Sequence, residues 1–136
     1  DRGIDLEKQA SKISFTMAVG SNYFMEIAKL RVLPWLFQKM VSQYLGKNTP
    51  VYSTLRAKTA TINKSQKDSY NNLIRTTLEA MSATIAKADE VLIFPFDEPF
   101  GVYDEFSERM ATNISRILEH ESKLNFVVDI SSGAYF

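Results

Sequence analysis

The chain has 136 residues, of which 45% are hydrophobic and 24% are charged, so it has the size and composition of one globular domain. Its 16 basic and 16 acidic side chains cancel, which disfavours nucleic acid as a partner because nucleic-acid-binding domains carry a basic excess. It contains no cysteine, and no apolar run approaches the roughly 20 residues that span a bilayer, so we expect a cytoplasmic protein without disulfides or a membrane partner.

The first third of the chain predicts a strand followed by a long helix. Residues 13–19 (ISFTMAV) form a short apolar run, and a helix is predicted from the Ser-Asn pair at 21–22 to about Tyr44, with Gly46 as its stop signal. Pro34 lies inside this helix and is expected to kink or split it. The chain begins with Asp-Arg-Gly and without a signal-peptide pattern, which predicts a fragment of a longer protein.

The middle of the chain repeats this order. Residues 51–57 predict a second strand, and a polar loop leads to the strongest helical pattern in the sequence, at residues 69–88. Apolar side chains recur there at three-to-four spacing and make one apolar face, which Leu73 widens: Ile74, Leu78, Met81 and Ile85.

The last third predicts a strand, a helix and a further strand. Residues 90–94 (EVLIF) read as a buried strand, and a loop (FDEPFGVYD) leads to Asp104, the predicted cap of a third helix. The apolar face of that helix is Phe106, Met110, Ile114, Ile117 and Leu118. Residues 124–129 (LNFVVD) predict a fourth strand.

The predicted order is therefore β-α-β-α-β-α-β. The strands read mostly as continuous apolar runs, which is typical of a parallel sheet covered by helices on both faces. Strands begin about every 35–40 residues, a unit size that suits either a (β/α)₈ barrel or an open doubly wound sheet.

Three segments resemble the methylmalonyl-CoA mutase family. Residues 15–31 resemble the family segment F-x-x-x-x-G-x-N-F-F-M-E-x-A-K-x-R, residues 68–81 resemble D-x-Y-N-N-x-x-R-T-x-x-E-A-M, and residues 106–118 resemble F-S-x-R-x-x-x-N-x-x-x-I-L. The resemblance covers essentially the whole chain. It implies an α/β fold, a βαβαβαβ fragment of a (β/α)₈ TIM barrel, with residues 1–136 as a partial acyl-CoA mutase barrel domain.

The same resemblance implies a reaction and a cofactor for the complete enzyme. The family rearranges methylmalonyl-CoA and succinyl-CoA by radical chemistry that adenosylcobalamin initiates. The cofactor is held by a separate domain whose D-x-H-x-x-G motif is absent here. We therefore expect no cofactor in this fragment and adenosylcobalamin in the holoenzyme.

The candidate site departs from the family pattern. Catalytic members carry R-x-H-x-Q-T-S-G-W-S, whose His and Gln bind the reacting acyl group. Counting from Arg56, the His position is Lys58 and the Gln position is Ala60. A lysine ammonium only donates hydrogen bonds and is strongly hydrated, and an alanine side chain neither donates nor accepts. Lys58 is thus interpreted as a degenerate catalytic position. The alternative interpretation is that Lys58 acts as a base or contacts a CoA phosphate.

Two other family segments are also altered. The family's R-L-S, which contacts the ligand, reads Lys12-Ile13-Ser14, so Lys12 and Ser14 are the remaining candidate substrate contacts. The strand Q-S-L-H-T-N is replaced, its His by Leu92, which predicts an interior filled by side chains. The only histidine, His120, is expected at the end of a helix, where a positive charge interacts favourably with the helix dipole. This interpretation is favoured over a role as a metal ligand.

These losses favour a non-catalytic small subunit that pairs with the catalytic large subunit of the mutase. The alternative is an active acyl-CoA mutase with an altered substrate, and a third possibility is an unrelated small α/β binding domain. Since four βα-type units cannot close an eight-stranded barrel, the isolated fragment is expected to self-associate or to be marginally stable.

Overall fold

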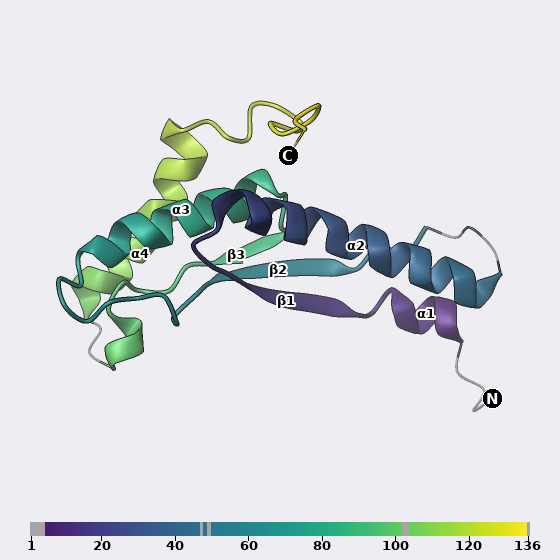
Figure 1. Cartoon of the computed structure of the whole chain (residues 1–136), viewed down its shortest axis with the longest axis horizontal. Coiled ribbons are helices and arrows are strands. Elements are labelled where there is room, and N and C mark those ends of the chain that lie inside the picture. Colours follow the sequence, from purple (N-terminus) through teal and green to yellow (C-terminus); the bar gives the residue numbers. More distant parts are fainter. Residues whose placement is uncertain (1–4, 47, 49, 102–103, 136) are drawn as a thin grey trace.

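A computed structural model describes residues 5–46, 48, 50–101 and 104–135 of the chain (Figure 1). Within these residues the elements follow one another as α1 (Leu6–Ala10), β1 (Ser14–Val19), α2 (Tyr23–Leu45), β2 (Thr54–Thr59), α3 (Asn71–Ile85), β3 (Glu90–Leu92), the 3₁₀ turn η1 (Glu98–Phe100), α4 (Glu105–Arg116) and the π-helical turn η2 (Ile117–Glu121). None of the helices in this described part is long and apolar enough to cross a membrane.

The three strands form one parallel sheet in the order β1-β2-β3. Its register pairs Ser14 with Thr54 at one end, and aligns Ala18, Lys58 and Leu92 across all three strands near the other. Parallel pairing of consecutive strands through intervening helices confirms the predicted α/β class.

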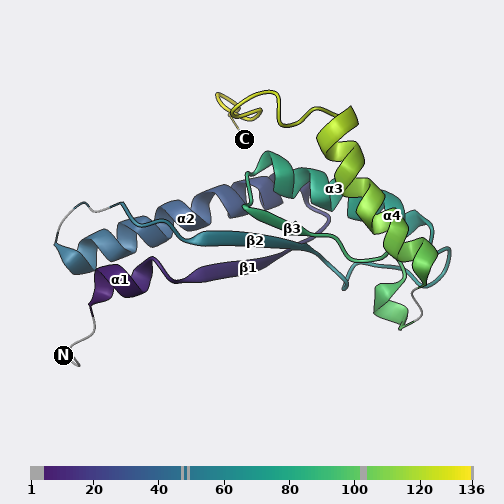
Figure 2. The same cartoon turned by 180° about the vertical axis from the view of Figure 1, so that it is seen from behind.

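Helices α2 and α3 lie side by side on one face of the sheet, and α4 lies beyond β3 (Figures 1 and 2). The core between this helix layer and the sheet consists of Val19, Ile27, Leu30, Leu55, Ala57, Ala83 and Ala86. Leu30 is fully buried, and it anchors the middle of α2 on the strands.

The other face of the sheet is not covered within the described residues. Burial alternates along β2: Leu55, Ala57 and Thr59 are buried, whereas Thr54 and Arg56 are exposed. Leu92 on β3 is 55% exposed. We call this side, which carries the even-numbered strand residues, the open face. The expectation of strands buried on both faces is therefore wrong for this segment, because a helix layer is present on one side only.

Helix α2 is continuous through Pro34, so the predicted split into two helices is wrong, whereas a kink at this residue stays a prediction. Proline removes one backbone donor, but Leu30, Phe37 and Val41 on either side of it are buried, and this packing retains the helix. The predicted stop is confirmed, since Gly46 caps the helix in the left-handed conformation at φ 63°.

The apolar face predicted for α3 is only partly packed. Ile74 is 63% exposed and Leu78 is 50% exposed, whereas Met81 and Ile85 are partly buried against the core clusters. The fully buried residues of α3 are polar or small: Asn72, Thr76, Glu79, Ala80, Ser82 and Ala83. Spacing identified the helix correctly, but hydrophobicity did not identify its most deeply buried side.

Helix α4 begins as the sequence predicts. The Asp104 carboxylate accepts the Ser107 amide at 2.9 Å, and the Ser107 hydroxyl accepts the Asp104 amide at 3.0 Å, which forms a capping box. On its predicted apolar face Ile114 and Leu118 are buried, whereas Phe106 is 40% exposed.

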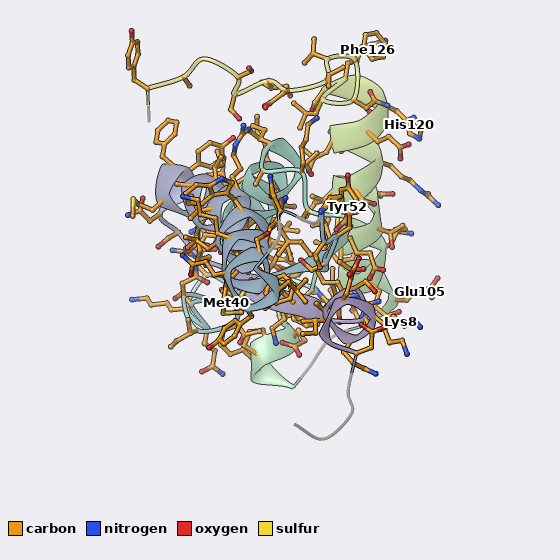
Figure 3. All side chains as sticks on the ribbon, turned by 90° about the vertical axis from the view of Figure 1, so that its right-hand side faces the viewer. Lys8, Met40, Tyr52, Glu105, His120 and Phe126 are labelled. Carbon is orange, nitrogen blue, oxygen red and sulfur yellow. The ribbon has the colours of Figure 1, made fainter. Side chains whose placement is uncertain are left out.

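The predicted fourth strand is wrong for this structure, because residues 124–129 adopt turns and bends. Phe126 is 72% exposed and Val128 is 86% exposed, and Figure 3 shows Phe126 and His120 at the periphery. The end of the segment is held elsewhere: the Arg31 guanidinium donates to both carboxylate oxygens of Asp129 at 2.8 Å. This bidentate contact fixes the segment beside α2 rather than along β3.

Three further boundaries differ from prediction. The second strand spans Thr54–Thr59 rather than residues 51–57, and the third ends at Leu92 rather than at Phe94. In each case the strand extends only as far as its neighbour provides backbone partners, since β2 pairs residue for residue with β1 and β3 meets β2 over three residues.

Candidate functional site

The carboxyl end of β2 carries the two positions singled out in the sequence. Lys58 lies on the open face, half-buried, between Ala18 of β1 and Leu92 of β3. Ala60 follows the strand and is only 6% exposed. Its backbone amide donates to the Val19 carbonyl at 2.9 Å and to a Glu79 carboxylate oxygen at 3.1 Å. The structure therefore presents an ammonium at position 58 and a buried methyl group at position 60.

The loop after β2 is bonded to α3 through Glu79. The Asn63 side-chain amide donates to Glu79 Oε1 at 2.6 Å, and Lys64 Nζ donates to both carboxylate oxygens at 2.7 Å. We call Ala60, Asn63, Lys64 and Glu79 the Glu79 cluster. The side chains of Lys64 and Glu79 are each 2% exposed, so this is a buried ion pair. Burial lowers the pKa of Lys64 below its usual value, while the Glu79 carboxylate opposes that change.

Asn72 bonds the same loop about two turns before Glu79 on α3. Its Nδ2 donates to the carbonyls of Ser65 at 2.9 Å and of Phe96 at 3.0 Å, and its Oδ1 accepts the Ser65 amide at 3.0 Å and an Arg75 guanidinium N–H at 2.8 Å. Asn72 is completely buried and makes four hydrogen bonds to three residues. It therefore joins the loop after β2 to the loop after β3.

The middle of the open face is occupied by an ion pair between strands. Arg56 Nε donates to Glu90 Oε2 at 2.6 Å, and a second guanidinium N–H donates to Glu90 Oε1 at 3.3 Å. Hydrogen bonding to Glu90 raises the pKa of Arg56 above its already high value, so the guanidinium is charged at neutral pH. The open face is thus polar in the middle and apolar at Leu92.

Lys12 and Ser14 lie at the opposite end of the sheet from Lys58. Ser14 begins β1 on the open face and Lys12 precedes it in a turn, and both residues are exposed. In register, Ser14 pairs with Thr54, four residues before Lys58, which corresponds to about 13 Å along the strand. Lys12 and Ser14 are near each other as sequence neighbours, but the structure does not bring either of them to Lys58.

The described residues provide no arrangement typical of metal chemistry. They contain no group of three or more His, Asp or Glu side chains that could hold an ion. His120 lies in η2 at the end of the α4 helical segment, as predicted, with its side chain 70% exposed and its Nε2 3.8 Å from Glu119. At that distance from its neighbour and at that exposure, the imidazole is a surface side chain.

The Glu79 cluster and Asn72 were missed in the sequence. Their signal is a second helical stripe in which Asn72, Thr76, Glu79 and Ala83 recur at spacings of four, three and four, opposite the apolar stripe. Polar residues on such a stripe are usually exposed, which is why the apolar stripe was the more prominent pattern.

Similarity to known proteins extends over the full length of the chain. A sequence model described as methylmalonyl-CoA mutase matches residues 1–136. The methylmalonyl-CoA mutase small subunit of Porphyromonas gingivalis is 41% identical over 138 residues, which cover 100% of this chain and 22% of that protein. The methylmalonyl-CoA mutase of Escherichia coli is 35% identical, with 98% of this chain and 19% of the relative covered.

A relative described as a large subunit is similar to the same degree. The methylmalonyl-CoA mutase large subunit of Propionibacterium freudenreichii subsp. shermanii is 36% identical over 98% of this chain and 18% of its own length. The chain thus spans 22% or less of each of these relatives.

Proposed function

The chain belongs to the methylmalonyl-CoA mutase family, and we propose that it is part of a non-catalytic subunit that pairs with the catalytic large subunit of the mutase. In this proposal the holoenzyme interconverts methylmalonyl-CoA and succinyl-CoA, and this subunit contributes fold and interface. Its location is the cytoplasm, in keeping with a sequence free of cysteine.

The observation that carries the proposal is the chemistry at the end of β2. The family resemblance assigns a His and a Gln to the positions of Lys58 and Ala60. A neutral imidazole and a carboxamide each donate and accept hydrogen bonds, whereas an ammonium only donates and a methyl group does neither. Holding a reactive acyl radical requires fixed contacts that exclude side reactions, and these two side chains do not supply them.

The open face gives independent support. An acyl-CoA lying along this face from Lys12 and Ser14 toward Lys58 would cross the Arg56–Glu90 ion pair. Displacing that pair would break two charge-assisted hydrogen bonds. Near the end of that path Leu92 adds an apolar side chain where the family resemblance assigns a His.

The family's cofactor does not fit the residues described here. Adenosylcobalamin supplies the radical in this family's reaction, and an imidazole is the ligand expected from the D-x-H-x-x-G motif. The one histidine of this chain is His120, exposed on η2 and away from the open face. We therefore assign no step of the reaction to a cofactor held by this segment.

Reconstitution of the complete protein with the large subunit tests the proposal. The two proteins are expected to co-elute on gel filtration, and turnover of methylmalonyl-CoA with adenosylcobalamin should require the large subunit. Both proteins are used at about 10 μM, roughly tenfold above a Kd of about 1 μM. Failure to co-elute at this concentration would contradict the proposal.

An active acyl-CoA mutase is the second candidate, because an undivided methylmalonyl-CoA mutase is also 35% identical over 98% of this chain. The complete protein would then convert an acyl-CoA with adenosylcobalamin in the absence of any large subunit. A matched variant, Lys58→Ala, separates the two candidates further. It should abolish such turnover if Lys58 takes part, and it should leave co-elution with a large subunit unchanged if the protein is a non-catalytic partner.

We also propose that residues 1–136 are a partial barrel domain. Three parallel strands in sequential order, with helices on one face and an open second face, are the arrangement expected of consecutive units of a (β/α)₈ barrel. The outer edges of β1 and β3 have no strand partner within the described residues. An isolated 136-residue segment should therefore self-associate, and a monomer in sedimentation velocity at about 100 μM would contradict this expectation.

A further inference from the structure

The Glu79 cluster decides where the polar side chains of the loop after β2 point. Asn63 and Lys64 are the residues of this loop best suited to bind a carbonyl or a carboxylate, and both are directed onto α3. Together with the Ala60 amide, they donate hydrogen bonds to the buried Glu79 carboxylate, which thus has partners on three residues. The donors that these two side chains direct to Glu79 therefore point to α3 and not to the open face.

The same cluster constrains position 60. The Ala60 amide is held between Val19 and Glu79, and its residue is 6% exposed, so the side chain at this position has little free space. A longer side chain there requires the loop to move away from α3. The loop cannot move without separating Lys64 from Glu79, which would leave a charge buried without its partner.

We propose that Lys64 is a positioning residue whose ion pair with Glu79 fixes the path of residues 60–65 against α3, and that this path prevents the end of β2 from forming an acyl-CoA site. The consequence for acyl-CoA rests on the proposed function, whereas the fixed path does not. Under this inference the loss of the family's His and Gln is coupled to a rearranged loop, and restoring those two side chains alone does not restore ligand contacts.

Hydrogen exchange in the complete protein tests the fixed path. In Lys64→Met, the amides of residues 60–65 are expected to exchange about 100-fold faster or more, because opening the loop no longer breaks a buried ion pair. Amides in the middle of α3, near Thr76 and Ala80, serve as internal reference and should change much less. The matched control is Lys67→Met, which removes an exposed lysine from the same loop. Equal exchange of residues 60–65 in the two variants would overturn the proposal.

A second pair of variants applies even where Lys64→Met does not fold. Glu79→Gln keeps the shape of the side chain and an oxygen for the Ala60 amide, and it should also increase exchange of residues 60–65. Ala60→Gln should lower the urea midpoint of the protein, and by a smaller shift when combined with Glu79→Gln, since the loop is then free to move. Additive shifts would overturn the coupling. Turnover of an acyl-CoA by the unmodified protein alone would refute the proposed function without changing these exchange results.

Discussion

Truncating Asn72 is expected to destabilise the protein strongly, because this side chain bonds two loops to α3. Asn72→Ala removes two donors and one acceptor for backbone groups, since the carbonyls of Ser65 and Phe96 and the amide of Ser65 lose this partner. Each buried group left unpaired costs about 1–3 kcal/mol, partly relieved where water enters, which gives a total of about 3–5 kcal/mol. Arg75 also loses a contact, but it is only part-buried and can bond water.

The neighbouring asparagine provides the control. Asn71 is exposed, and its side chain makes one bond, to Asp68 Oδ2 at 2.7 Å. Asn71→Ala should therefore change the free energy of unfolding by less than about 1 kcal/mol. Urea denaturation of both variants, followed by far-UV circular dichroism, compares the same chemical change at adjacent positions.

An isosteric variant separates lost hydrogen bonds from lost volume. Asn72→Asp keeps the shape but places a carboxylate oxygen against the carbonyls of Ser65 and Phe96. It should cost at least about 2 kcal/mol although it opens no cavity. If Asn72→Ala and Asn71→Ala differ by less than about 1 kcal/mol, the inference that Asn72 joins the two loops is wrong.

Three further outcomes are expected. Gly46→Ala should destabilise α2 by about 1 kcal/mol in thermal denaturation, because the residue adopts φ 63° and nothing lies within 4 Å of an added Cβ; an unchanged Tm would contradict this. Pro34→Ala should stabilise the protein by about 1–3 kcal/mol by restoring a helical donor, and lower stability on urea denaturation would indicate that the proline ring packs better than expected. Hydrogen bonding from Arg31 lowers the pKa of Asp129, so the contact should be fully present above pH 3.8 and be lost as the pH falls through the lower, folded-state pKa. An NMR titration of the Asp129 carboxylate with a midpoint at or above 3.8 would refute this.

The order of elements could be predicted because it depends on local signals. Gly46 ends α2 and Asp104 begins α4 for reasons contained within a few residues, namely the left-handed conformation and a short side-chain cap. The first strand was placed within one residue of its observed start at Ser14. Such signals operate without tertiary contacts and are therefore readable from sequence.

What could not be predicted depends on distant partners. The side of α3 that packs carries Asn72 and Glu79, and their burial makes sense only once the loop after β2 supplies Ser65 and Lys64. Residues 124–129 have the composition of a strand, but a strand also requires an edge with partners, and in this structure Arg31 holds Asp129 instead.

The candidate site was predictable in composition but not in arrangement. Counting from Arg56 identified Lys58 and Ala60 as altered positions, and the structure places both at the end of β2. The sequence did not reveal that the adjoining loop is bonded to α3, because Lys64 and Glu79 are 15 residues apart and each alone is typical of a solvated surface.

The exposure of Ile74 and Leu78 on α3 also affects the solubility of this protein during expression. The exposed side chains of Ile74 and Leu78 favour association with other hydrophobic surfaces. Such association increases with the concentration of the protein. Overproduction of the protein should therefore yield inclusion bodies, whereas synthesis at a low level should yield soluble material.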